Sequence, residues 1–446
     1  RANGITTGAT VTEFVIDPKT NKVVSAKDAI KKVALYNYAT KKFGKTPGAP
    51  TEAVVLEDSY GKYHTTALSR FCSSSFAPAG IFSSKVGGRT VGYNGGVYFT
   101  GEEAGDEGRG FGLTTTGELV QLPRLGLASW ETFNAVATGS VKTAIIGTED
   151  GPDNKSQVRM YVGDKTSAGT WYDKAGLNNG KSYVLALTDV RTDTAFRTKY
   201  EKGKEVAVHF AEVDWKQGGT GQNIDAADAG FGFSGIEDIS VDPSNPNDYY
   251  FVQKSSAKAA VALTLDPDNA LVTKRDGGAM WKLSFTDVKN PQKGATLAMV
   301  LDGSEAPYLN MPDNITVDKP GNVLIQEDRG NNAQVSRVFA YNIATKKIAT
   351  VAKFKDVYFS PDATFATSKI TEDEESSGII EVTNFFKKSA SDKNSYYLLD
   401  AQIHVTAMLA RPDITDAATK LELEKLIEGG QLYLMTVADW SAISFK

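Results

Sequence analysis

Between residues 180 and 360 the chain repeats one pattern, a short run rich in β-branched and aromatic residues followed by a cluster of turn residues. The turn clusters include Asp242-Pro243 and Lys319-Pro320-Gly321. The runs cover residues 183–187, 206–213, 248–252, 280–285, 322–326, 338–341 and 348–354. Many short strands with little helix between them predict an all-β sandwich, barrel or propeller. Repetition at the length of a blade favours a β-propeller, and we expect six blades with helical and loop insertions.

The rest of the chain is expected to belong to the same domain, because no low-complexity linker interrupts it. A helix is predicted over residues 26–42 and a buried strand at 54–56. A second helix is predicted over 414–428, where Gly429-Gly430 ends it, and a strand follows at 431–437. We therefore predict a single β-propeller domain over residues 1–446.

Composition limits the classes of partner. The net charge is −5 and no basic stripe is present, which argues against nucleic acid. No apolar run approaches the roughly 20 residues that span a bilayer. A single cysteine, Cys72, rules out an intrachain disulfide. Because the chain opens on Arg1 rather than Met, we expect a removed signal peptide and a secreted, periplasmic or cell-surface protein.

Acidic residues gather at or near the ends of the predicted strands. Four carboxylates stand in a row at Glu372-Asp373-Glu374-Glu375, and pairs occur at Glu102-Glu103, Glu149-Asp150, Glu237-Asp238 and Glu327-Asp328. Such runs are often solvated loops. Their recurrence near strand ends instead suggests that several segments deliver oxygen ligands to one place. Calcium takes six to eight such oxygens from carboxylates and carbonyls.

Cys72 has two interpretations. A free cysteine is often a small buried hydrophobic residue, whereas a thiolate binds iron, copper or zinc in preference to calcium.

The segment after the predicted strand at 95–100 holds Glu102-Glu103 and Glu107-Gly108-Arg109. The glutamate pair can bridge cations, and the Arg109 guanidinium can hold an anionic group. A glycine-rich surface loop with a local salt bridge is the alternative.

Three further segments embed polar groups among apolar residues. Glu131 and Asn134 lie in Trp130-Glu131-Thr132-Phe133-Asn134, and a buried glutamate there would need a partner such as a metal. Glu237-Asp238, Asp313-Asn314 and Glu327-Asp328 are similarly placed, although ordinary polar turns would also explain them. Because neighbours on a strand point to opposite faces, the sequence leaves open which carboxylate of each pair is the ligand.

Familiar catalytic motifs are absent. His64, His209 and His404 lack the spacing of a zinc hydrolase, and no GxSxG, P-loop or dinucleotide motif is present. Asp400, Gln402 and His404 would share one face of a strand, pointing either into an acidic site or into solvent.

The ordered set of motifs resembles the PhoX-type family of bacterial exported alkaline phosphatases. The motifs that carry the resemblance, over residues 60–437, are Arg70-Phe71-Cys72-Ser73, Gly101-Glu102-Glu103 with Glu107-Gly108-Arg109, Trp130-Glu131-Thr132-Phe133-Asn134, Gly235-Ile236-Glu237-Asp238, Asp313-Asn314-Ile315-Thr316-Val317-Asp318, Gln326-Glu327-Asp328, Glu374-Glu375-Ser376-Ser377-Gly378-Ile379-Ile380 and Leu399-Asp400-Ala401-Gln402-Ile403-His404. The resemblance implies a β-propeller with metals at the mouth of its channel and activity on phosphomonoesters. It implies iron, held partly by the Cys72 thiolate, together with calcium. It implies metal carboxylates at Glu103, Glu131, Glu237, Glu327, Glu374 and Glu375.

The chain departs from that pattern in three ways. An insertion containing Gly87-Gly88 separates the cysteine from the glutamate pair, Gly235 stands where an arginine for phosphate is expected, and the chain is shorter. Arg109 or Arg329 would have to replace the missing arginine, and Asn134 is a further candidate for contacting substrate.

The set of candidate site residues is therefore broad. The candidate metal ligands are Cys72, Glu102, Glu103, Glu131, Glu237, Asp238, Asp313, Glu327, Asp328, Glu374 and Glu375, with calcium, and iron as a second metal. We expect a secreted metal-dependent phosphoesterase acting on a small phosphorylated substrate. The main alternative is a non-catalytic, calcium-stabilised cell-surface or extracellular assembly protein, which would assemble with itself at the cell surface. A third is a lactonase-like or phytase-like propeller hydrolase that uses calcium alone.

Overall fold

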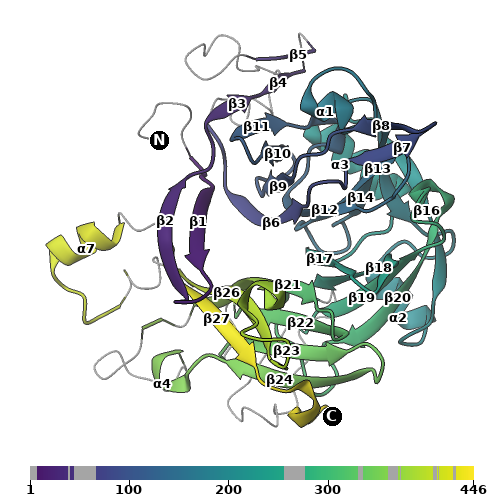
Figure 1. The fold of residues 1–446 in the computed structure, drawn as a ribbon. Coiled ribbons are helices and arrows are strands. Elements are labelled where there is room, and N and C mark those ends of the chain that lie inside the picture. Colours follow the sequence, from purple (N-terminus) through teal and green to yellow (C-terminus); the bar gives the residue numbers. More distant parts are fainter. Residues whose placement is uncertain are drawn as a thin grey trace.

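The computed structural model describes residues 8–38, 41–44, 67–255, 277–329, 335–359, 370–371, 373–404, 409, 411–424 and 428–446. Within these residues the chain is an all-β propeller, drawn as a ring of sheets in Figure 1. Each sheet buries both of its faces against neighbouring sheets. The central strands are therefore nearly continuous apolar runs.

Five blade sheets form the ring in the described residues, and each is built outward from an inner strand, the second and third being joined at their outer edges into one nine-stranded sheet. The first holds β6 (Phe71–Ala77), β9 (Val97–Glu102), β10 (Gly110–Thr114) and β11 (Glu118–Gln121), with β3 (Lys32–Ala34) added parallel to β11. The second holds β12 (Trp130–Val136), β13 (Lys142–Glu149), β14 (Val158–Asp164) and β15 (Lys181–Ala186). The third holds β17 (Ile236–Asp242), β18 (Asn245–Gln253), β19 (Ala279–Phe285) and β20 (Ala295–Asp302). The fourth holds β21 (Pro312–Val317), β22 (Asn322–Glu327), β23 (Arg337–Asn342) and β24 (Lys347–Lys353), and the fifth holds β25 (Glu374–Glu381), β26 (Ser395–His404) and β27 (Glu428–Val437).

The inner strands β6, β12, β17, β21 and β25 are neighbours in that order. A hairpin of β1 (Thr12–Asp17) and β2 (Lys22–Asp28) lies between the fifth and first sheets (Figure 1). Val11, just before β1, packs against the core of the first sheet, and Ile16 packs against the core of the fifth. The hairpin thus takes the sixth position of the predicted ring.

Separate apolar cores fill the spaces between adjacent sheets. The largest lies between the second and third sheets and includes Phe233, Phe251 and Trp281. β16 (Val206–Val213) pairs with both β15 and β20, which joins the outer edges of these two sheets.

Short helices and hairpins decorate the loops between strands. The helices are α1 (Trp171–Lys174), α2 (Asp193–Lys199), α3 (Gly219–Ala229), α4 (Asp356–Phe359), α5 (Thr383–Phe386) and α7 (Ala417–Glu424), with 3₁₀ turns at Pro123–Leu125, Pro291–Lys293 and Trp440–Ala442. Two small hairpins pair β4 (Tyr36–Asn37) with β5 (Lys42–Phe43) and β7 (Ser83–Val86) with β8 (Arg89–Gly92). None of the described helices is both long and apolar enough to span a membrane.

Most strand predictions are confirmed, and one helix prediction is wrong. The seven runs predicted between 180 and 360 correspond to β15, β16, β18, β19, β22, β23 and β24. Residues 26–42 contain the end of β2, then β3 and β4, because Val33 is buried where β3 pairs with β11. The helix at 414–428 is confirmed over Ala417–Glu424 and the strand at 431–437 lies within β27, whereas the strand predicted at 54–56 lies outside the described residues.

Candidate metal centre

The second residue of each inner strand carries a potential metal ligand. These residues are Cys72 in β6, Glu131 in β12, Glu237 in β17, Asp313 in β21 and Glu375 in β25. Inner strands of a propeller run side by side around the central channel, so the same position in each strand lies at the same end of the channel. The fold therefore gathers one thiol and four carboxylates from five sheets.

In four of these strands a β-bulge coincides with the ligand position. The register against the second strand shifts between Phe71 and Ser74, Trp130 and Phe133, Ile236 and Ile239, and Pro312 and Ile315. Two inner-strand residues there oppose one residue of the partner, which frees them from the ladder and redirects their side chains. β25 differs, since its register shifts later, between Ser377 and Ile380.

The ligand atoms form two overlapping groups. Cys72, Glu103 and Glu131 each offer an atom within 4.8 Å of the others, and so do Glu131, Glu237 and Asp313. Glu131 belongs to both groups. The first group contains sulfur, and the second contains only oxygen, which matches the different preferences of transition metals and calcium.

Glu131 has the environment that most needs a cation. Its side chain is 1% exposed, and neither carboxylate oxygen has a hydrogen bond of good geometry among the described residues. The Cys72 thiol and the Ser73 hydroxyl lie near enough to lower its pKa. Burial outweighs them and raises the pKa of Glu131 to about 7. A buried polar group without partners costs free energy that a bound metal would recover.

Neighbouring groups show the same electrostatic conflict. Burial raises the pKa of Glu237 well above its usual value, and the nearby carboxylates of Asp150 and Glu131 raise it further. Burial likewise raises the pKa of Asp313, with contributions from Glu237 and Glu375. The pKa of the Cys72 thiol is raised by burial and then by Glu131. A cation at the centre would reverse these shifts by favouring the ionised forms.

Two basic side chains border the cluster. The Lys254 Nζ lies 3.0 Å from the Glu237 Oε1 and also pairs with Asp150. Burial lowers the pKa of Lys254, but Glu237 and Asp150 raise it by more, so the side chain is a cation. Arg70 pairs with Glu103 and its side chain is 68% exposed.

Gly235 makes room for Lys254. Its φ is +65°, and a Cβ there would come within 2.9 Å of the Lys254 Cγ. Sequence reasoning gave neither Lys254 nor Arg70 a role. The signal for Lys254 was its position directly after β18, which matches Glu103 after β9 and Asp150 after β13.

The structure separates the two members of each acidic pair. In three sheets, the last residue of the second strand is a glutamate that points into its own sheet. It pairs there with an arginine that lies in the third strand or directly before it. Glu102 pairs with Arg109 through Oε1 to Nη2 at 2.6 Å, Glu149 pairs with Arg159 at 3.3 Å, and Glu327 pairs with Arg337 at 2.9 Å. Glu374, the first residue of β25, similarly pairs with Arg329 at 3.2 Å. We therefore leave Glu102, Glu327 and Glu374 out of the metal centre, because arginines already compensate their charges.

The second members of the pairs lie toward the channel. Glu103 belongs to the sulfur-containing group, and Asp328 and Glu375 are close enough to Asp313 to raise its pKa. Asp238 is an exception, since its carboxylate accepts hydrogen bonds from the backbone amides of Ile239 and Ile315 at 2.7 and 3.3 Å. It ties two inner strands together rather than joining the cluster.

The three predicted substrate-binding residues do not meet at the cluster. The side chains of Arg109 and Arg329 are each 2% exposed and engaged with Glu102 and Glu374. The Asn134 Nδ2 donates to the Ile239 carbonyl at 3.3 Å, which again links neighbouring inner strands. Because their polar groups already have partners inside the fold, we do not include these residues in the proposed substrate site.

The face predicted on β26 does approach the site. The His404 Nε2 lies 3.7 Å from the Glu375 Oε2. The pKa of Asp400 is raised to about 6 by burial and then by Glu375. These residues extend the acidic environment beyond the two ligand groups.

Comparisons with known proteins bear on the fold. Neither the models of known protein families nor the curated proteins gave a match. Among solved structures, PhoX from Pseudomonas fluorescens in complex with vanadate, a transition state analogue, is similar with a TM-score of 0.53 and 11% identity over 93% of this chain and 75% of that chain. The match to an ACO/RPE65 chimera covers 84% of this chain and 68% of that chain at 10% identity, but its TM-score of 0.28 is too low to support a shared fold. The chain therefore has a distant PhoX-like propeller fold, and at this identity the likeness concerns the fold alone.

Proposed function

We propose that this chain is a metal-dependent phosphoesterase whose metal centre includes Cys72, Glu103, Glu131, Glu237 and Asp313. The observation that carries the proposal is Glu131, a buried carboxylate shared by two ligand groups and lacking good hydrogen bonds. Asp328 and Glu375 are candidates for completing the oxygen-rich side, because calcium takes six to eight ligands.

The donor set favours two kinds of metal. Thiolate in the first group suits a transition metal such as iron, and the all-oxygen second group suits calcium. Bound metals would polarise a phosphoryl oxygen and lower the pKa of a water nucleophile. The likeness of the fold to a vanadate-binding PhoX supports a phosphoester as substrate.

The basic residues at the rim have a role in this proposal. Arg70 and Lys254 neutralise Glu103 and Glu237 in the metal-free protein. Once a cation takes over those carboxylates, both side chains can turn to the phosphate, where arginine offers two parallel N–H donors. They would thus replace Arg109 and Arg329 as the anion-binding groups. By the family resemblance we also propose that the protein is exported.

The test is hydrolysis of p-nitrophenyl phosphate and bis-p-nitrophenyl phosphate by protein loaded with iron and calcium. We expect Glu131→Gln and Cys72→Ser to abolish turnover. Glu212→Gln is the matched control, since Glu212 pairs with Lys181 on the surface and its side chain is 51% exposed. Loaded wild-type protein that releases no p-nitrophenol from either ester, or a Glu131→Gln variant as active as the control, would sink the proposal.

One observation favours the non-catalytic alternative. The β1–β2 hairpin exposes Phe14 at 54% and Val24 at 62%, although it occupies the sixth position of the ring. Exposed apolar side chains in one element are typical of an association surface. A calcium-stabilised assembly protein would show self-association that Phe14→Ser weakens, together with no turnover on either ester.

A further inference from the structure

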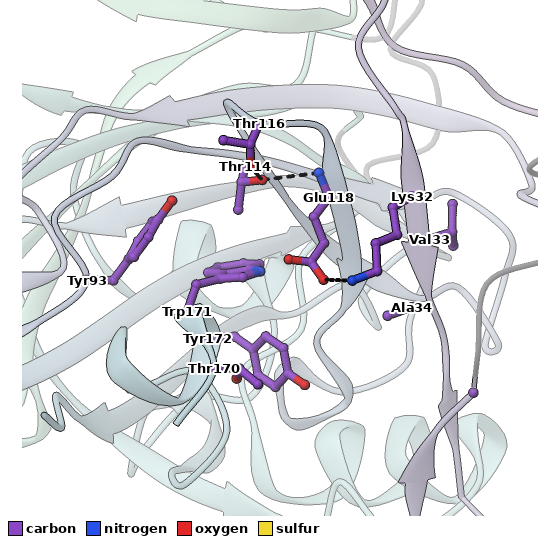
Figure 2. A pocket seen from close by; sticks show the side chains of 11 residues that line it. Lys32, Val33, Ala34, Tyr93, Thr114, Thr116, Glu118, Thr170, Trp171 and Tyr172 are labelled. Atoms are coloured by element: carbon purple, nitrogen blue, oxygen red, sulfur yellow. Dashed lines mark hydrogen bonds and ion pairs between the residues drawn. The ribbon is translucent and has the colours of Figure 1, made fainter. Parts of the chain in front are cut away.

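A cavity lies outside the channel, on the outer edge of the first sheet (Figure 2). Its volume is about 720 Å³, and it lies between β3, the turn from β10 to β11, and the start of α1. Three strands, β11, β10 and β9, separate β3 from the inner strand β6 that carries Cys72. The cavity therefore shares no residue with the metal centre.

Aromatic rings form the apolar wall of this cavity. Trp171 lies between Tyr93 and Tyr172, with ring centroids 5.6 and 5.5 Å away and interplanar angles of 47° and 89° (Figure 2). The indole is held against β10 at Gly112, where a Cβ would come within 2.9 Å of the Trp171 Cη2. A capping box between Thr170 and Asp173 starts α1 and fixes the two aromatic residues that follow the cap. The Trp171 ring is thus already fixed in place, so a ligand that packs on it would cost little side-chain entropy.

Polar groups face the same space without net charge. The Glu118 carboxylate pairs with the Lys32 ammonium at 3.0 Å, and the Thr114 and Thr116 hydroxyls lie 2.9 Å apart. The Trp171 Nε1 is buried, and Figure 2 shows the nitrogen-bearing end of the ring toward Glu118. A ligand with hydroxyl groups could exchange hydrogen bonds with the exposed Thr116 hydroxyl and donate to the Glu118 carboxylate, whose side chain is 29% exposed.

We propose that this cavity binds a neutral oligosaccharide. A sugar ring presents C–H faces that pack on aromatic rings and hydroxyls that need a small number of placed polar partners, which is the combination found here. The paired charges of Glu118 and Lys32 disfavour an anionic ligand, because a phosphate or carboxylate would meet the Glu118 oxygens. This site is independent of the metal centre and of the reaction proposed there.

The test titrates maltotriose, cellotriose and chitotriose into the whole protein, with binding followed by calorimetry and tryptophan fluorescence. At least one of the three should bind and change the fluorescence. Trp171→Ala should weaken that binding by roughly tenfold, the loss of one aromatic contact, whereas Trp171→Phe should keep most of it. Phe385→Ala, which removes a 75% exposed aromatic ring elsewhere, is the matched control and should bind as wild type does.

A second variant covers the case in which Trp171→Ala does not fold. Thr116 is exposed at the cavity rim, and Thr116→Arg should block the cavity and unbalance its charges without touching the core. Loss of binding in Thr116→Arg with an unchanged melting temperature supports the proposal. Absence of binding by all three sugars, unchanged affinity in Thr116→Arg, or tighter binding of a sulfated sugar than of its neutral parent would overturn it.

Discussion

At the scale of single residues, the buried glutamates are of two kinds, those paired with an arginine and those without one. Glu327 and Arg337 form a buried pair with two hydrogen bonds of 2.9 Å, so the charge of Glu327 is compensated. Glu131 is equally buried and lacks such a partner. Burial of the ionised form therefore costs free energy at Glu131, whereas the pair with Arg337 offsets that cost at Glu327.

This contrast predicts opposite effects of the same substitution. In chelator, Glu131→Gln should raise the free energy of unfolding by about 1–3 kcal/mol, because it removes a buried charge without good partners. Glu327→Gln should lower it by about 3–5 kcal/mol, because Arg337 is left uncompensated. Urea denaturation of both variants measures the difference. Destabilisation of equal size in both variants would contradict the assigned roles.

The raised pKa values predict how stability depends on pH. Glu131 has a folded pKa of about 7, above its unfolded value, so between those values the folded state binds more protons than the unfolded state. The free energy of unfolding from this group therefore falls as pH rises toward 7. In chelator the melting temperature should fall between pH 5.5 and 7.5, and Glu131→Gln should flatten the slope. With calcium bound the slope should also flatten, and an identical slope with and without calcium would count against the site.

At the scale of elements, the alternation of side chains at the end of each strand decides which carboxylate of a pair can reach the metal centre. β9 ends at Glu102, which points into the sheet toward Arg109, while Glu103 follows it and joins Cys72 and Glu131. The sequence showed the pair but not its orientation, because the turn after the strand and the bulge in β6 both set the direction. A bulge leaves no trace in an apolar pattern, so the sequence grouped Cys72 and Glu131 in one metal site only through the family resemblance.

Adjacent glutamates should consequently respond differently. Glu103→Gln should reduce bound metal and change the metal-free stability by about 1 kcal/mol or less, because its partner Arg70 is 68% exposed and stays solvated. Glu102→Gln should lower stability by about 3–5 kcal/mol through the uncompensated Arg109, while the folded fraction keeps its metal. Metal content per folded molecule, combined with thermal melting, separates the two outcomes. A Glu102→Gln variant that loses metal while staying stable would reverse the assignment.

The strand predictions are most accurate where both faces of a strand are buried. β22 and β23, which are buried along nearly their whole length, match the predicted runs at 322–326 and 338–341. The helix prediction at 26–42 failed, although the apolar residues there are spaced as in a helix. Pairing with β11 draws them into β3, and Lys32 and Glu118, which meet in this contact, are 86 residues apart in the sequence. Long-range pairing of this kind overrides local propensity.

At the scale of the whole molecule, metal binding should act on the ring as one unit. The ligand groups draw on the first, second, third and fourth sheets, through Cys72, Glu131, Glu237 and Asp313. Without metal, these carboxylates repel one another where the sheets meet. With metal, the same residues hold adjacent inner strands together.

The ring should therefore melt as a single domain whose stability depends on cation concentration. Calcium at about 100 times its dissociation constant should stabilise the folded state by about 2.7 kcal/mol. Calorimetry should show one transition that moves upward with calcium and downward in chelator. Two transitions, of which only one responds to calcium, would contradict a single domain over residues 1–446.

The most direct test of the metal centre is elemental analysis of protein purified without chelator, alongside Cys72→Ser and Glu131→Gln. We predict calcium together with iron in the wild type, loss of iron alone in Cys72→Ser, and loss of both metals in Glu131→Gln, because Glu131 belongs to both ligand groups. Wild-type protein without bound metal, or a Glu131→Gln variant with its full metal content, would contradict the account.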